Sequence, residues 1–269
     1  MRAAQFTEPA VFRGLCKNWP ARQWTQQQLM RALPSVRVSR SRSGEFPRDR
    51  DTGNQCPTET LPTAAFFEEL KRRPHCYVHG EMLPESLLAD CPTPALLADE
   101  KVARRSLWIS GSGACSPLHY DLPMVLLCQL HGRKRVWLYS PALHDRMRPR
   151  GGSYPALTAQ ERIARTARSS LRDVEGQFVL LEPGDALLMP SGFFHEVESE
   201  GDDGEGGLCI SVGMNWPEIG NAISAFARWR EHVKAYPVLT QGEVLTLYYG
   251  EAKAKAACPE PGFSLPVFA

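Results

Sequence analysis

A succession of short apolar segments between residues 106 and 216 limits the fold of this chain more than any other feature. The segments are rich in β-branched and aromatic residues and are bounded by glycine, proline or charged residues; they read SLWIS, MVLLCQL, RVWLYS, FVLLEPGDALLMP and GLCISVGMNW. This texture is typical of β-strands, and several such strands separated by turns predict a sandwich or a small barrel. Hydrophobic residues make up 43% of the 269 residues, which is enough for one large core.

Helices are expected on both sides of this β region. WTQQQLMRAL after Thr25 and TAAFFEELKRR after Pro62 have apolar residues at helical spacing, and VRVS between them predicts a strand. An insertion over 141–176 contains a further helix in TAQERIARTARSSLRD, and NAISAFARWREHVKAY begins a helical C-terminal part. We therefore divide the chain into three parts of one compact unit: an N-terminal segment (1–105), the β core (106–216) and a C-terminal helical segment (217–269).

The bulk composition excludes some classes of protein. The formal net charge is +1, so the overall field favours neither nucleic acid nor a membrane surface. The longest apolar runs fall far short of the ~18 residues of a membrane span. The eight cysteines contain no Cys-x-x-Cys pair, and the first residues lack the apolar stretch of a signal peptide. We expect a soluble protein of a reducing compartment, the cytoplasm or the nucleus.

The stretch SPLHYD, residues 116–121, places an imidazole and a carboxylate between two apolar segments. Residues two apart on a strand share one face, so His119 and Asp121 are expected to converge. A third candidate, His195, follows the Ser191-Gly192 turn where a new strand begins. Two histidines and one carboxylate form the facial triad that binds iron and leaves coordination positions open for substrates. The alternative is that His119 is an ordinary core histidine.

The position of Lys134 relative to this motif indicates a second binding group. Lys134 lies 15 residues beyond His119, past a turn at Gly132, on the second strand of what reads as a hairpin. A lysine there can bind an anionic co-substrate. The third ligand comes from a different part of the sheet, which is how a barrel builds a site in its mouth.

These motifs, together with EPAVFRGLCKNWPARQWT, resemble the JmjC-type, cupin-like oxygenases that use Fe(II) and 2-oxoglutarate. Within that group the chain resembles the small hydroxylases, such as the hypoxia-factor asparaginyl hydroxylase and the wybutosine-tRNA hydroxylase. The resemblance implies a mainly β fold with flanking helices around a double-stranded β-helix, the jelly-roll core of cupin and JmjC proteins. It also implies hydroxylation of a C–H bond of a protein or a modified tRNA base, with release of succinate and CO2.

The resemblance assigns roles to individual residues. His119, Asp121 and His195 match the metal ligands and the catalytic centre, and Lys134 matches the lysine that pairs with the distal carboxylate of 2-oxoglutarate. Ser116, three residues before the first ligand, matches a hydroxyl-bearing position that also contacts this carboxylate. Two further positions match the co-substrate pocket less closely; they are Tyr77 in CYVHG, and either Gly213 or Asn215 in ISVGMNWP, of which we choose Asn215.

Several alternatives remain open at the level of sequence. The chain can be an N-methyl demethylase with the same metal chemistry, or a cupin-like binding protein without turnover. A second metal site at His75 and His79 is disfavoured, because residues four apart on a strand do not converge. Five large apolar residues can line the pocket or pack in the core; they are Trp108, Tyr120, Leu126, Trp137 and Phe194.

Charge is distributed unevenly along the chain. The segment 133–172 has an excess of eight positive charges, which predicts contact with an anionic protein or an RNA such as tRNA. Its ten basic residues are Arg133, Lys134, Arg135, Arg146, Arg148, Arg150, Arg162, Arg165, Arg168 and Arg172. The alternative is a solvated segment balanced by acids elsewhere, such as the acidic run over 196–205, which reads as a loop. The C-terminal helices are a candidate surface for a homodimer.

Overall fold

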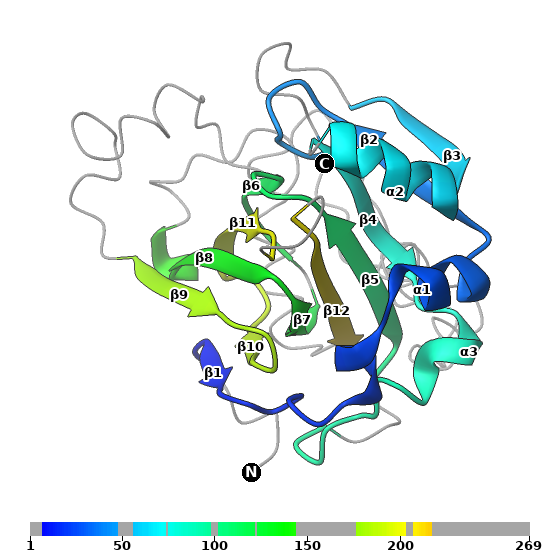
Figure 1. Ribbon diagram of the computed structural model, residues 1–269. Coiled ribbons are helices and arrows are strands. Elements are labelled where there is room, and N and C mark those ends of the chain that lie inside the picture. Colours follow the sequence, from blue (N-terminus) through cyan, green and yellow to red (C-terminus); the bar gives the residue numbers. More distant parts are fainter. Residues whose placement is uncertain are drawn as a thin grey trace, which may run out of the picture.

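Two antiparallel β-sheets face each other in the computed structural model, which describes residues 7–47, 56–73, 75–97, 102–121, 123–143, 176–202 and 207–216 (Figure 1). The larger sheet has the order β1 (Ala10–Phe12), β10 (Ala186–Met189), β7 (Met124–His131), β12 (Cys209–Trp216), β5 (Arg104–Ser110), β4 (Cys76–Met82), β2 (Ser35–Arg40) and β3 (Thr58–Pro62). The smaller sheet has the order β6 (Cys115–Tyr120), β11 (Phe194–Glu200), β8 (Arg133–Tyr139) and β9 (Gln177–Leu181).

The eight strands from β5 to β12 form a double-stranded β-helix. Along the chain they pass back and forth between the sheets, so that β5, β7, β10 and β12 lie in the larger sheet and the other four form the smaller one. The predicted fold class is confirmed. The strands β1 to β4 extend the larger sheet at its two edges, so the N-terminal segment is continuous with the core.

The predicted hairpin around Gly132 is wrong. The strands β7 and β8 are consecutive, yet they belong to different sheets, because the chain crosses between the sheets at this glycine. Gly132 has φ +62°, and a Cβ there would lie 2.7 Å from the carbonyl oxygens of Glu200 and Leu208. Only glycine fits such a corner. FVLLEPGDALLMP is likewise divided, with β9 in the smaller sheet and β10 in the larger one.

The helices cover one face of the larger sheet (Figure 1). The helix α1 (Gln26–Ala32) begins after Thr25 as predicted, and the structure adds a capping box in which the Thr25 side chain accepts from the Gln28 backbone N–H. The helix α2 (Thr63–Arg72) buries Phe66, Phe67 and Leu70, and a short α3 (Glu85–Leu88) follows β4. Two single turns complete the described helical structure, at Pro20–Gln23 and Pro141–Leu143.

Two apolar cores result from this arrangement. The larger lies between the helices and the outer face of the larger sheet, and it includes Leu29, Leu107 and Leu126. The smaller lies between the two sheets and includes Val136 and Val197. The inner faces of β4, β5 and β12 carry polar residues instead, so one part of the interior between the sheets is left for a site.

Several sequence predictions fall outside the described residues. These are the helix of the insertion and the C-terminal helical segment with its possible dimer surface. The acidic run was expected to be a loop, whereas its first part belongs to β11. None of the helices in the described ranges is long and apolar enough to cross a membrane.

Candidate metal centre

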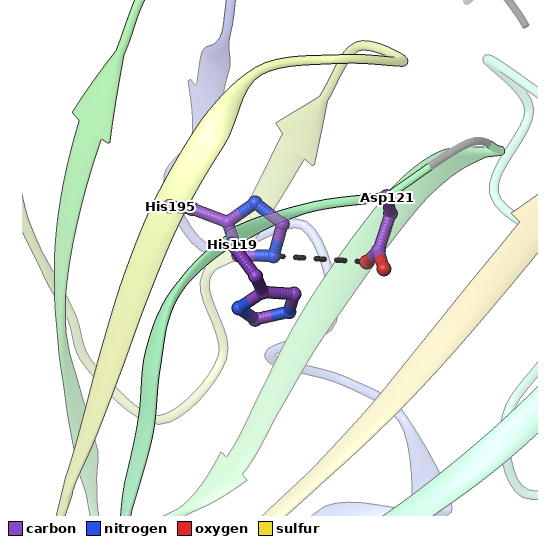
Figure 2. Close-up of side chains that lie close together, drawn as sticks. All are labelled: His119, Asp121 and His195. Atoms are coloured by element: carbon purple, nitrogen blue, oxygen red, sulfur yellow. Dashed lines mark ion pairs between the residues drawn. The ribbon is translucent and has the colours of Figure 1, made fainter. Parts of the chain in front are cut away.

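His119, Asp121 and His195 converge between the sheets, with candidate ligand atoms that all lie within 4.8 Å of one another (Figure 2). His119 on β6 and His195 on β11 are direct neighbours across the antiparallel ladder, and their ring centroids are 4.3 Å apart. Asp121 follows the end of β6, and its Oδ2 lies 3.6 Å from Nε2 of His195. No other group of this kind occurs among the residues the structure describes.

Backbone contacts fix the orientation of both imidazoles. Nδ1 of His119 lies 2.6 Å from the carbonyl oxygen of Pro117, and Nδ1 of His195 lies 3.0 Å from that of Phe193. In each ring Nδ1–H donates to the carbonyl, which leaves the Nε2 lone pair for a metal. Burial, and then the nearby His119, lower the pKa of His195 to about 4, so this ring is neutral at neutral pH.

A β-bulge explains why Ser116 and His119 share a face although they are three residues apart. In the ladder between β6 and β11, Ser116 lies opposite Val197 and His119 lies opposite His195. The chain therefore advances three residues on β6 but only two on β11. The extra residue on β6 reverses the in–out alternation of side chains at this point of the strand. Ser116 and His119 both point between the sheets as a result.

Lys134 is buried at some distance from the metal ligands along the sheet. Its side chain is 3% exposed, and Nζ donates to Oγ of Ser199 at 3.0 Å. The same ammonium lies 5.8 Å from the ring centroid of Tyr77. Ser116 and Lys134 both lie close enough to Tyr77 to influence the pKa of its phenol, which burial raises. Three of the four predicted co-substrate residues thus form one cluster.

The interior around this cluster contains unpaired polar atoms. Ser110, opposite Tyr77 in the sheet, has a buried hydroxyl without a hydrogen bond, and so does Ser211. Ser211 in turn lies opposite Gln129, whose Oε1 is also buried and unpaired. Among the residues in the described ranges, Lys134 has no carboxylate partner either. Buried ammonium, hydroxyl and amide groups ordinarily have hydrogen-bond or ion-pair partners. A ligand with a carboxylate would supply partners for these groups.

Asn215 lies elsewhere. It is opposite Val125 on one side and Arg104 on the other, near the end of β12, whereas Cys209, near Lys134, is at the start of this strand. Asn215 therefore belongs to the level of the metal ligands and not to the Lys134 cluster. Its role toward the co-substrate stays a prediction.

His79 is a pocket residue that the sequence did not indicate. It lies on the inner face of β4, its ring contacts Trp108 at 4.5 Å between centroids, and its pKa is influenced by His119, Asp121 and Lys134. His75 is directed elsewhere, with Nδ1 3.3 Å from the carbonyl oxygen of Arg42. The pair does not converge, as expected from its spacing.

Of the five apolar residues considered as pocket walls, only Trp108 borders the site. Leu126 packs in the larger core. Tyr120 contacts Phe194, and Trp137 contacts Phe178. These residues are strand neighbours of inward-facing residues, so alternation directs them to the opposite face.

Part of the basic segment is neutralised locally. Arg133 forms an ion pair with Glu200 on the neighbouring strand, and Arg135 pairs with the other oxygen of the same carboxylate at 3.1 Å. Glu200 belongs to the acidic run over 196–205. For these two arginines the structure therefore agrees with the alternative that acids in this run balance the basic segment. The segment from 144 to 172 lies outside the described residues.

Comparison with known proteins agrees with the fold and the site. The sequence matches the cupin-like domain family over residues 2–222. It is 38% identical over 96 residues to Jumonji C domain-containing protein 5 of Drosophila melanogaster, covering 35% of this chain and 24% of that protein. It is 29% identical over 168 residues to lysine-specific demethylase JMJ31 of Arabidopsis thaliana, covering 58% and 28%, respectively.

A third relative, HSPB1-associated protein 1 of Rattus norvegicus, is 26% identical over 227 residues, covering 71% of this chain and 46% of that protein. The chain thus spans less than half the length of these curated relatives. The match to the family nevertheless extends across both sheets and includes all three converging side chains. The chain is a member of the cupin-like domain family.

Proposed function

We propose that this protein is an Fe(II)- and 2-oxoglutarate-dependent oxygenase that hydroxylates a C–H bond of a macromolecular substrate. One observation supports this most strongly. Lys134 is 3% exposed, has no carboxylate partner among the described residues, and lies in the same interior as the His119, Asp121 and His195 cluster. A buried ammonium of this kind is costly unless an anion pairs with it.

Each group in the site has a defined part in this function. Two neutral imidazoles and one carboxylate are the donor set of the facial triad, which suits iron(II) and leaves positions for other ligands. Lys134, with Tyr77 and Ser116 beside it, would hold the distal carboxylate of 2-oxoglutarate. When bound, iron, 2-oxoglutarate and dioxygen supply the oxidation of the C–H bond. The protein orients the substrate and keeps water out of the interior.

Demethylation of a methylated lysine is a second candidate, because three of the relatives carry the name lysine-specific demethylase. It uses the same donor set, since hydroxylation of an N-methyl group releases formaldehyde. A binding protein without turnover is disfavoured, because the complete donor set and Lys134 are both retained. A protein or an RNA can be the substrate, with the basic segment over 133–172 as the proposed contact, and we propose a cytoplasmic or nuclear location.

The experiment is a comparison of metal binding and turnover in three variants. His119→Ala and Asp121→Ala should lose stoichiometric Fe(II) and the formation of succinate from 2-oxoglutarate, while the fold remains, because ligands of an open site seldom hold a core together. His75→Ala is the matched control and should behave like the parent protein. Stoichiometric iron and unchanged turnover in Asp121→Ala would contradict the proposal.

A further inference from the structure

His79 has an imidazole that none of the described residues satisfies. Within the described residues neither ring nitrogen makes a hydrogen bond, and the ring contacts are to Tyr77 and Trp108. Burial, and then the proximity of the His119 imidazole, lower the pKa of His79 to about 4, so the ring is neutral at neutral pH. A neutral imidazole offers one donor and one acceptor, and both are available to a ligand.

The backbone around His79 is built to hold this side chain in place. Val78 lies opposite Ile109, and Glu81 lies opposite Leu107, so β4 carries one extra residue in a bulge at positions 79 and 80. Bulges next to active sites re-aim a side chain. Gly80 has φ +68°, which favours glycine.

Arg104 and Trp108 hold the bulge in place through hydrogen bonds and packing. Arg104 Nη2 donates to the carbonyl oxygen of Gly80 at 2.6 Å, and its Nε donates to Oγ of Ser106 at 2.8 Å. A Cβ on Gly80 would lie 3.4 Å from the ring of Trp108, so this ring packs against the bulge. The orientation of His79 is therefore fixed before any ligand binds.

Two more hydrogen-bonding groups continue the same wall. A Cβ on Gly213 would lie 3.3 Å from Nε1 of Trp108 and 3.5 Å from Oδ1 of Asn215, so both groups border the space above this glycine. In the described part of the chain neither the indole N–H nor the Asn215 amide has a hydrogen-bond partner. We call His79, Trp108 and Asn215 the polar wall. It lies across the interior from the metal ligands, since it belongs to the larger sheet and they belong to the smaller one.

The charges near the polar wall disfavour a cationic ligand. Lys134 and Arg37 both act on His79, and Arg104 lies on the adjacent strand, whereas the carboxylate that acts on His79, that of Asp121, is a candidate metal ligand. Recognition of a methylated ammonium relies on carboxylates or on open aromatic faces. Here the rings of Tyr77, His79 and Trp108 contact one another. The wall thus offers mainly hydrogen-bonding groups, whereas RNA recognition ordinarily uses the stacking of bases on aromatic faces.

From these observations we propose that the polar wall is the substrate-binding surface of this oxygenase and that it selects an uncharged, hydrogen-bonding side chain of a polypeptide. Donors and acceptors in a neutral setting match a carboxamide, a hydroxyl or a neutral imidazole. This inference rests on the proposed oxygenase function. It makes His79 a specificity-determining residue, because it contacts the substrate and not the metal.

The test uses synthetic peptides of one common sequence whose central residue is varied. The set contains uncharged polar, charged, apolar and mono-, di- and trimethylated lysine residues, and total tRNA is a separate arm. Product is measured as a +16 mass shift or as formaldehyde, and succinate is measured in parallel. The proteins are the parent, His79→Leu, His79→Gln and the matched control His75→Leu. Fe(II) content, 2-oxoglutarate affinity and thermal unfolding are determined for each.

The expected result is hydroxylation of peptides with an uncharged polar centre. His79→Leu should lower kcat/KM for them by about 10- to 100-fold, His79→Gln should recover part of the loss, and His75→Leu should match the parent. Fe(II) content and 2-oxoglutarate affinity of His79→Leu should stay at parental values, and calorimetry without oxygen should show weaker binding of the best peptide. If His79→Leu does not fold, His79→Gln and Trp108→Phe carry the same comparison.

Other outcomes overturn the inference. Turnover of methylated lysine peptides alone, of tRNA alone, or of no peptide while the parent still converts 2-oxoglutarate would each refute it and leave the oxygenase function standing. Equal kcat/KM in His79→Leu and the parent would do the same. A parent protein that neither binds Fe(II) nor forms succinate would instead refute the proposed function.

Discussion

Replacing Lys134 with methionine tests the proposed co-substrate site most directly. Methionine has a similar length, and it removes the charge without leaving a large cavity. The side chain of Lys134 is 3% exposed and its described hydrogen bond is to Ser199, so the charge is buried without a carboxylate partner in the described ranges. Lys134→Met should therefore stabilise the ligand-free protein, by on the order of 1–3 kcal/mol.

The same substitution should weaken the binding of 2-oxoglutarate. A charge-assisted hydrogen bond to a carboxylate contributes roughly 1.5–3 kcal/mol, which corresponds to a loss of about ten- to hundred-fold in affinity. The affinity for Fe(II) should change little, because the three candidate ligands come from β6 and β11 and the turn after β6, whereas Lys134 lies on β8.

Calorimetry with 2-oxoglutarate and with 2-oxobutyrate, which lacks the distal carboxylate, gives the assay. The parent protein should prefer 2-oxoglutarate strongly, and Lys134→Met should bind the two acids with similar affinity. Thermal unfolding without ligand measures the predicted stabilisation. A variant that still prefers 2-oxoglutarate as strongly as the parent would refute the assignment of Lys134, because the distal carboxylate would then be bound elsewhere.

Three further predictions concern the fold and the partner. Gly132→Ala should lower the free energy of unfolding by about 2 kcal/mol or more, since its Cβ would meet two carbonyl oxygens at positive φ; chemical denaturation measures this, and an unchanged midpoint would contradict it. The hydrogen bond from Arg40 lowers the pKa of Glu69, so its stabilising contribution is present above the ordinary carboxyl pKa and is lost as the pH falls through the lowered value. Denaturation of the parent and Glu69→Gln across this range should show their difference shrinking toward acid, and a constant difference would count against the pair. If RNA binds the basic segment, replacing the three arginines in 162–168 with alanine should reduce the log–log salt slope of tRNA binding by about one per arginine, and equal slopes would exclude that contact.

Much of the candidate site could be predicted from the sequence because its signals are local. His119 and Asp121 are two residues apart, and His195 follows a turn at the start of a strand. Short apolar segments and turn residues are likewise properties of neighbouring residues, and they sufficed to predict a sandwich or small barrel and α1, whereas the double-stranded β-helix was implied by the family resemblance. Lys134 was found by its distance along the chain, although the hairpin assumed for it does not exist.

Features that depend on strand register were beyond the sequence. The choice of sheet for β7 and β8 is decided by which strands pair across the molecule, and no local pattern at Gly132 distinguishes a hairpin from a crossing between sheets. The sequence could not fix the register of Asn215 either; pairing places it opposite Arg104 and away from the Lys134 cluster, and its role toward the co-substrate stays a prediction.

The sequence by itself determined the strand pattern, the triad and the lysine, because period-two alternation and short spacings are written in adjacent residues. The tertiary structure decided which face each residue shows, since one extra residue in a strand reverses the alternation beyond it. The bulge in β6 brings Ser116 to the side of His119, and the bulge in β4 directs His79 toward Trp108. A bulge is defined by the register between a strand and its partner, and the partner strands here are distant in the sequence. Neither bulge could therefore be predicted from neighbouring residues.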